Sequence, residues 1–270
     1  MPYARELRGQ VIVKFCVLAS SSSGNCAMIA TERTRILIDA GLSRKETFAR
    51  LQAIGENPED IDAVLITHEH SDHVCGLVTL ARKLKDGKVP IFLSRLTAPT
   101  VDWGEFEPTV EHFQAGSRFR VGDIEIDSFT IPHDAADPCG FCFRADGVKI
   151  AVVTDLGYMP DSVKIHLRGT DLLLLESNHD LEMLKVGPYP WSVKQRVMGR
   201  RGHLSNEVVS DFLENELDTS VSTIILGHLS EQNNHPEIVR NSAGKALDGR
   251  RLFTRLVVAE PKKQTEVFQY

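Results

Sequence analysis

The stretch THEHSDH (67–73) directly follows a run of four apolar residues. Where a strand runs out into a loop, side chains two residues apart point the same way, so His68 and His70 can reach one ion. Asp72 and His73 lie slightly further along the chain and can reach a second ion. Imidazole nitrogens and carboxylate oxygens are the usual ligands of zinc and other divalent first-row metals. The stretch therefore predicts a metal site at the end of a buried strand.

Three more apolar runs lead to a residue of the same ligand types. IDSFTIP is followed by His133, KIAVVT by Asp155 and TIILG by His228. Each of these residues alone would be an ordinary polar residue at a strand end, but together they complete a ligand set. The predicted ligands are His68, His70 and His133 for one ion, Asp72, His73 and His228 for the other, and Asp155 as the bridge between them.

Seven ligands exceed what one ion uses, so we expect two divalent metal ions per chain. The residue types suit zinc, manganese and iron. Two ions about 3.5–4 Å apart can hold both the attacking and the leaving oxygen of a displacement, and they lower the pKa of a bound water from about 15.7 towards 7. The chemistry predicted for this centre is hydrolysis by a metal-bound hydroxide.

The composition is that of an ordinary globular protein. The 270 residues are 42% hydrophobic and 25% charged, enough for one large core. The net charge of −6 gives no general attraction for nucleic acid, so binding of a polyanion requires a local basic patch. Five cysteines, an odd number, do not suggest a disulfide framework.

The apolar run VIVKFCVLA (11–19) resembles a signal sequence only superficially. It is far too short to span a membrane, Glu6 and Lys14 interrupt the charge pattern, and no cleavage motif follows. We interpret it as the first strand of a cytoplasmic protein without membrane contact. Residues 1–10 are then an N-terminal extension, followed by a single hydrolase domain over residues 11–270.

Strand hairpins and strand–helix alternation are mixed along the chain. Residues 119–132 and 140–155 have the pattern of paired strands. Ser43 begins a capping box with Glu46, which predicts a helix ending near Gly55. Further helices are expected around 193–198, over 205–217 and from Pro236, with strands at 35–41, 171–176, 222–227 and 265–270. This mixture predicts an α/β (α+β) fold in which two mixed β-sheets lie between helices, an αββα sandwich.

Two further stretches offer groups to a substrate. SSSSGN (20–25) is either a plain hairpin loop or a source of polar groups near the site, with Ser23 and Asn25 as candidate substrate-binding residues. Basic residues gather just before His203 and suit phosphate, or else form a solvated helix face. The other candidate substrate-binding residues are Lys194, Arg196, Arg200 and Arg201 of this basic cluster, and His179.

On these residues the sequence resembles the metallo-β-lactamase superfamily. The likeness rests on HEHSDH (68–73), His133 in IPHD, Asp155 in VVTD and His228 in LGHLS, and it covers nearly the whole chain after the first ten residues. It implies an αββα sandwich with a dinuclear metal centre at the edge of the two sheets. It also implies that Asp39, in LIDAG, is an acid that supports the metal ligands from behind.

Within the superfamily, the chain is most similar to the YycJ-like (WalJ-type) DNA-processing enzymes. The shared features are ASSSSGN near the start, ESNHD (176–180), YPWSVKQR (189–196) and RGHLSN (201–206). A further likeness is to ribonuclease Z, in which a glutamate and a histidine between the last two metal motifs assist leaving-group protonation. Glu176 and His203 fall in matching places, so the resemblance implies a catalytic role for both.

The sequence therefore predicts a metal-dependent phosphodiesterase or nuclease, resembling a 5′-exonuclease on DNA. Asp72 would orient the nucleophile, and Glu176 and His203 would assist the leaving group. Two alternatives remain: a thioester or lactone hydrolase like glyoxalase II, and a non-catalytic metal-binding partner protein. The short tail after His228 leaves little room for the glutathione-binding domain of glyoxalase II, and the basic cluster favours phosphate. The sequence fits DNA and RNA alike and sets no oligomeric state.

Overall fold

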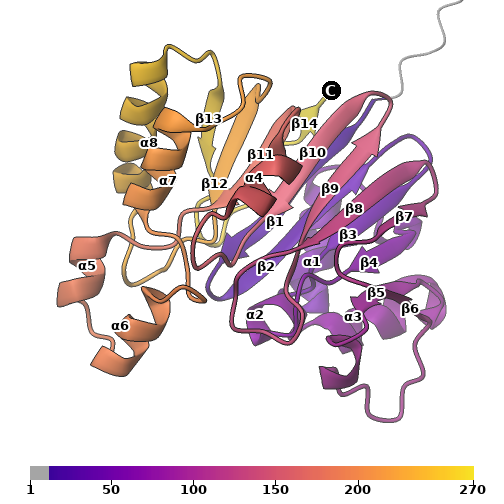
Figure 1. The fold of residues 1–270 in the computed structure, drawn as a ribbon. Helices are drawn as coiled ribbons and strands as arrows, with labels where there is room; N and C mark the ends of the chain where they lie inside the picture. The colour runs from indigo at the N-terminus through magenta and orange to yellow at the C-terminus, as the bar shows by residue number, and fades with distance from the viewer. Residues whose placement is uncertain (1–11) are drawn as a thin grey trace, which may run out of the picture.

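Two β-sheets pack face to face, and helices cover the outer face of each sheet (Figure 1). The structure, a computed structural model, describes residues 12–270. This architecture confirms the predicted αββα sandwich of two mixed sheets. The N-terminal extension predicted over residues 1–10 lies outside the described residues.

The first sheet contains strands from the N-terminal half and the C-terminal strand. In spatial order these are β14 (Phe268–Gln269), β1 (Lys14–Ser21), β2 (Gly24–Ala30), β3 (Arg35–Ile38), β4 (Ala63–Leu65), β5 (Ile91–Ser94) and β6 (Val110–Phe113). The pairs from β14 to β3 are antiparallel, and those from β3 to β6 are parallel. The sheet is therefore mixed, and its parallel part has the strand leading to the THEHSDH stretch near its centre.

The second sheet has a similar mixture. In spatial order its strands are β13 (Arg255–Val258), β12 (Thr223–Gly227), β11 (Leu172–Glu176), β10 (Val148–Val153), β9 (Cys139–Ala145), β8 (Ile124–Thr130) and β7 (Arg118–Val121). The pairs from β13 to β10 are parallel, and those from β10 to β7 are antiparallel. Four neighbouring parallel strands, β10 to β13, thus end at one edge of this sheet.

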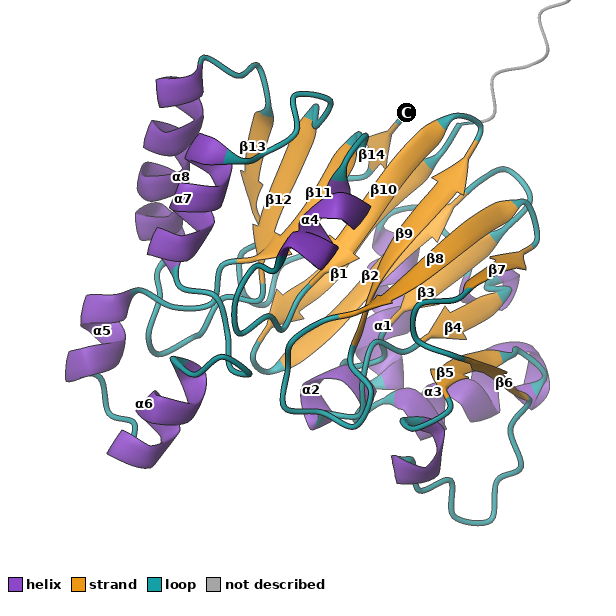
Figure 2. Cartoon of the chain, viewed as in Figure 1, coloured by secondary structure: helices purple, strands orange, loops and turns teal. Residues whose placement is uncertain are grey.

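Helices lie on the outer face of each sheet, and α5 (Leu181–Val186) and α6 (Trp191–Val197) lie together beyond the second sheet (Figure 2). Those on the first sheet are α1 (Arg44–Ala53) and α3 (Leu77–Lys83), and those on the second are α4 (Asp161–Leu167), α7 (Asn206–Asn215) and α8 (Pro236–Arg250). The others are α2 (Ser71–Val74) and the 3₁₀ turns η1 (Pro58–Asp60), η2 (Leu84–Gly87) and η3 (Ala98–Thr100). Over residues 12–270, no helix is long and apolar enough to cross a membrane.

Strand side chains alternate between two buried layers. In β11, Leu172 and Leu174 belong to the core between the sheets, and Leu173 and Leu175 pack under the helices of the second sheet. Phe141, fully buried between the sheets, is among the largest side chains of the central core. Burial of each such side chain stabilises the fold by about 1.5–3 kcal/mol. Because both faces of the sheet are covered, these strands are nearly continuous apolar runs.

Most predicted elements are present with shifted ends. Only the N-cap half of the expected capping box is formed: Oγ of Ser43 accepts the backbone N–H of Glu46 at 3.2 Å, and the carboxylate of Glu46 pairs with Arg50 instead. The strand expected over 11–19 begins at Lys14, and the last expected strand is reduced to β14. The sequence did not predict β6, α4 or α5. β6 is a largely exposed edge strand, and α5 is too short to show a helical repeat.

Candidate metal centre

The ligand-type residues lie where the carboxyl ends of strands from both sheets meet. β10, β11 and β12 run parallel, and β8 points the same way because it is antiparallel to β9. At or just beyond the ends of these strands lie His133, Asp155, Glu176 and His228. In the first sheet the THEHSDH stretch follows β4. The backbone N–H of Cys139 donates to the carbonyl oxygen of Thr67 at 3.0 Å, which joins the two sheets at this edge.

His68, His70 and His133 form a first group of potential ligands. One ring nitrogen of each lies within 4.8 Å of the others. Nδ1 of His70 and Nε2 of His133 are 3.2 Å apart. Two imidazole nitrogens at this distance either share a proton or direct both lone pairs at a common cation. The group therefore has the geometry of a three-histidine cation site.

Asp72, His73 and His228 form a second group, again with potential ligand atoms within 4.8 Å of one another. Asp155 lies between the groups. Its Oδ2 is 3.3 Å from Nε2 of His73, and its Oδ1 is 3.2 Å from Nε2 of His228. Its Oδ1 is also 3.7 Å from Nε2 of His133, a member of the first group. The carboxylate of Asp155 therefore reaches both groups, as a bridging ligand must.

His73 and His133 are each oriented by a hydrogen bond on the side that faces away from the other ligands. Nδ1 of His73 lies 2.8 Å from Oδ2 of Asp39, and Nδ1 of His133 lies 3.1 Å from the carbonyl oxygen of Gly202. Donation from Nδ1 to these acceptors leaves the lone pair on Nε2, which is the form that binds a metal. Both histidines thus present Nε2 to the centre.

His68 and His228 are arranged in the same way. Nδ1 of His228 is 3.1 Å from Oδ1 of Asn25, and Nδ1 of His68 is 3.0 Å from Oγ1 of Thr67. Nε2 of His68 is buried and has no hydrogen-bond partner within residues 12–270. Burial holds the pKa of His68 well below its ordinary value, so its imidazole is neutral. An unpartnered neutral nitrogen beside buried carboxylates fits a divalent cation.

Asp39 supports this arrangement from behind, as the resemblance implies. Its Oδ1 accepts the backbone N–H of Thr67 at 2.8 Å, while its Oδ2 accepts Nδ1–H of His73 at 2.8 Å. The hydroxyl of Thr67 lies 3.0 Å from both carboxylate oxygens. Asp39 is buried, and a buried carboxylate requires such partners.

Three residues of the centre have a left-handed backbone conformation. The φ angles of Asp39, Asp155 and His228 are 62°, 64° and 54°. This conformation costs about 1–3 kcal/mol for a residue other than glycine and persists where the surrounding structure holds it. Gly41 is also constrained, because a Cβ there would lie 1.7 Å from the carbonyl oxygen of Asp72. The chain therefore bends sharply as it leaves these strands and packs closely around the ligands.

Glu176 and His203 form an ion pair beside the ligands. Nδ1 of His203 lies 2.6 Å from Oε1 of Glu176, whose other oxygen accepts the backbone N–H of Leu156 at 2.8 Å and of Leu204 at 3.2 Å. Burial lowers the pKa of His203, but the carboxylates of Glu176, Asp155 and Asp72 together outweigh burial and raise this pKa to about 9. His203 lines the same cavity as Asp72. The pair therefore places a protonated imidazole at the cavity wall.

A cavity of about 290 Å³ opens over these groups. The residues that line it are Ser22, His70, Ser71, Asp72, Asp155, Arg196, His203 and His228. Sequence reasoning missed Ser22 and Ser71, although Ser71 lies within the metal motif itself. In the serine run it selected Ser23, whose exposed hydroxyl instead donates to Oε1 of Glu231 at 2.6 Å.

The prediction that Asn25 and His179 bind substrate is corrected by their burial. Only 5% of Asn25 and 1% of His179 is exposed. The amide nitrogen of Asn25 donates to Oδ2 of Asp72 at 3.0 Å, and its Oδ1 faces Nδ1 of His228. Burial lowers the pKa of His179 to about 4, so this histidine is neutral. Asn25 therefore holds two potential ligands in place rather than contacting substrate.

The basic cluster is divided by the fold. Lys194 is buried and its Nζ donates to a backbone carbonyl oxygen at 2.7 Å, which corrects the prediction that it binds substrate. Arg196 lines the cavity, and its Nε donates to Oδ2 of Asp134 at 2.5 Å. Residues two apart on a helix do not share a face, so α6 turns these two side chains in different directions. Arg200 and Arg201 are exposed and line a neighbouring groove.

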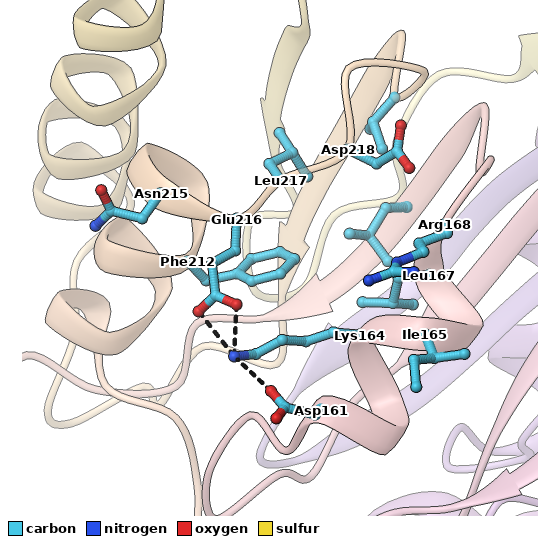
Figure 3. A pocket seen from close by; sticks show the side chains of 12 residues that line it. Asp161, Lys164, Ile165, Leu167, Arg168, Phe212, Asn215, Glu216, Leu217 and Asp218 are labelled. Atoms are coloured by element: carbon cyan, nitrogen blue, oxygen red, sulfur yellow. Dashed lines mark hydrogen bonds and ion pairs between the residues drawn. The ribbon is translucent and has the colours of Figure 1, made fainter.

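A larger cavity of about 530 Å³ lies on the outer side of the second sheet, between α4 and α7 (Figure 3). Phe212 and Leu217 supply part of its apolar lining. Nζ of Lys164 pairs there with Asp161 at 3.2 Å and with Glu216 at 2.6 Å. Its lining contains no histidine, and the carboxylates beside Lys164 are already neutralised by it. This cavity is therefore not the metal centre.

Comparisons with known proteins agree with this geometry. The model of the β-lactamase superfamily domain matches residues 34–228. The chain is 37% identical over 242 residues to exodeoxyribonuclease YycJ of Bacillus anthracis, covering 87% of this chain and 89% of that protein. It is 39% identical over 230 residues to exodeoxyribonuclease WalJ of Streptococcus pneumoniae, covering 83% and 84%. The metallo-β-lactamase fold protein YhfI of Bacillus subtilis matches with a TM-score of 0.74 at 15% identity, covering 96% of this chain and 100% of that chain.

The chain belongs to the metallo-β-lactamase superfamily and is YycJ-like within it. This confirms the resemblance expected from the sequence. Membership implies a divalent metal centre, and the clustered histidines and carboxylates fit one.

Asn25→Ala should weaken metal binding about 10–100-fold, the usual effect of removing a partner that orients a ligand. The reason is that the Asn25 amide holds both Asp72 and His228. Competition with a coloured chelator measures the apparent Kd. Asn241→Ala, at an exposed position of α8, is the matched control and should bind as the parent does. Unchanged affinity in Asn25→Ala would make this residue a packing element alone.

Proposed function

We propose that the protein is a metal-dependent phosphodiesterase that cleaves nucleic acid, acting on DNA as a 5′-exonuclease. The observation that carries the proposal is that Arg196 and His203 line the same cavity as the ligand groups. Hydrolysis of a phosphodiester needs a cation that neutralises the negative charge of the phosphate, an activated water that attacks phosphorus, and a proton for the leaving group. Similarity to two exodeoxyribonucleases over more than 80% of the chain supports DNA as the substrate.

We propose two metal ions per chain, of zinc, manganese or iron. When bound, such ions lower the pKa of a coordinated water and neutralise charge on the phosphodiester oxygens. The proposed ligands are His68, His70 and His133 for one ion, Asp72, His73 and His228 for the other, and Asp155 for both.

Asp72 would also orient the attacking water. Its Oδ2 accepts a hydrogen bond from Asn25 and lies 3.4 Å from Nε2 of His73, so the carboxylate is fixed in direction. The side chain is 20% exposed and lines the cavity, which leaves it accessible to a water that approaches phosphorus. A carboxylate placed in this way would accept a hydrogen bond from the water and align its lone pair with phosphorus.

His203 would protonate the leaving alkoxide, and Glu176 would position it. The bond between Nδ1 and Glu176 turns the opposite nitrogen, Nε2, away from that carboxylate. The ion pair favours the imidazolium, which holds the proton that the expelled oxygen needs. Arg196 would bind a non-bridging phosphate oxygen, with Asp134 keeping its guanidinium beside the cavity.

Protein reconstituted with metal should degrade DNA from its 5′ end, and a chelator should abolish the activity. Single- and double-stranded DNA and RNA of one sequence, labelled at either end, reveal both polarity and nucleic-acid preference. S-Lactoylglutathione is the counter-substrate for a glyoxalase-like activity and should not be hydrolysed. Turnover of the thioester without turnover of DNA would overturn the proposal, and a fully metal-loaded protein inert to both would indicate a non-catalytic role.

Elemental analysis of the protein, after removal of excess metal, should give close to two equivalents per chain. His133→Ala removes a ligand of only one proposed ion and should lower this value towards one. His112→Ala, which alters an exposed histidine of β6, is the control and should retain two equivalents. A stable value of one in the parent would contradict the bridging role of Asp155.

His203→Ala should retain its metal but lose about 10²–10⁴-fold in rate on DNA, the usual contribution of a general acid. On bis(p-nitrophenyl) phosphate, whose leaving group needs little protonation, the loss should be much smaller. Steady-state rates on both substrates, with metal content measured in parallel, test the role. Equal losses on the two substrates would exclude proton donation and point to phosphate binding instead.

A further inference from the structure

A second groove adjoins the metal centre at His133. Its volume is about 490 Å³, within the range of sites for small organic groups. One wall comes from the end of β8 and the turn after it, residues 130–133 and 135–138, and the other contains Tyr158, Arg200 and Arg201. His133 belongs both to the groove and to the proposed ligands, so the groove lies beside the metal centre.

The Tyr158 side of the groove carries a stacked pair. The guanidinium carbon of Arg200 lies over the ring of Tyr158, 4.2 Å from its centroid. The backbone next to Tyr158 packs closely against the backbone of Arg200, because a Cβ at Gly157 would lie 2.2 Å from the carbonyl carbon and oxygen of Arg200. This close contact keeps the two side chains side by side. Arg200 is exposed and forms no ion pair with a carboxylate in the described part of the chain. Tyr158 therefore backs a planar cation that is free to receive a ligand.

The opposite wall differs in chemistry. Pro132, Ala135 and Pro138 supply apolar surface, and Asp137 adds a carboxylate. A carboxylate repels a phosphate but accepts an N–H group. Apolar walls and a planar cation suit the flat face of a heterocycle, because bases stack on aromatic rings and on guanidinium planes. This combination fits a nucleobase better than a phosphate.

We propose that the groove binds the base of the nucleotide next to the scissile phosphate, stacked on Arg200 with Tyr158 behind it. The choice of substrate class rests on the proposed function. Stacking tolerates any base, since each has a flat π face, so the groove recognises the presence of a base rather than a sequence. The rival role for Arg200 is a simple phosphate contact, and the two roles make different predictions.

Titration calorimetry of the metal-loaded protein with deoxyadenosine monophosphate and with deoxyribose 5-phosphate separates these roles. The parent should bind the nucleotide at least about 10-fold more tightly, the scale of one stacked base. Tyr158→Ala should reduce this ratio towards one, and Tyr158→Phe should preserve it. Arg200→Lys should also reduce it, because lysine keeps the charge without the flat surface. Phe253→Ala removes a fully exposed aromatic ring before β13 and is the control.

A single abasic residue next to the cleaved bond provides a test that does not depend on any variant folding. It should raise KM of the parent about 10-fold relative to intact DNA. If the parent binds the nucleotide and the sugar phosphate equally well, the groove does not bind a base, even if the protein cleaves DNA. If binding depends on the base but no nucleic acid is cleaved, the base-binding role of the groove stands and the proposed nuclease function is wrong. The rival role predicts another pattern. If Arg200→Lys keeps the ratio of the two Kd values, and Arg200→Ala weakens binding of the nucleotide and of the sugar phosphate equally, Arg200 contacts the phosphate instead.

Discussion

The metal centre depends on one buried carboxylate that cannot remain unpaired. Asp39 lies beyond the end of β3, and its two oxygens bond the backbone of Thr67 and the ring of His73. Leaving such a charge without partners in the interior would cost several kcal/mol. These two bonds hold the first and last residues of the THEHSDH stretch, so the ligands between them take one arrangement. The interaction links the first sheet to both proposed ion sites.

The second sheet completes the centre, because neither sheet contains the whole ligand set. Strand ends supply His133, Asp155 and His228, and the last two have strained left-handed backbones. The strain is small beside the stabilisation from the central core, which packs strands of both sheets together. The sandwich therefore sets the orientation of these side chains, because each extends from a strand end and both histidines are held by a hydrogen bond from behind.

For the attraction of a polyanion, the distribution of charge over the protein matters more than the net charge. The chain carries a net charge of −6, yet residues 183–206 contain five lysines and arginines and no aspartate or glutamate. The fold buries Lys194 of this segment and places Arg196, Arg200 and Arg201 around the cavity and the groove. A basic edge at the cavity of a protein with negative net charge would direct polyanions to the metal centre. At the same edge, the guanidinium of Arg200 lies beside the flat ring of Tyr158 and the apolar groove wall, and together these surfaces suit a nucleotide.

The sequence by itself determined the fold class and singled out the residues proposed as ligands, because both depend on local patterns. Apolar runs ending in histidine or aspartate mark strands buried on both faces, and parallel strands end at one edge. The residues that contact substrate are harder to predict from the sequence. Asn25, His179 and Lys194 look like surface polar residues in the sequence, but their side chains are buried. Whether a polar side chain faces a cavity or the interior depends on the turn of a loop or helix against its neighbours. Only the tertiary structure could therefore bring Tyr158 under Arg200, 42 residues later in the chain, and place their groove beside His133.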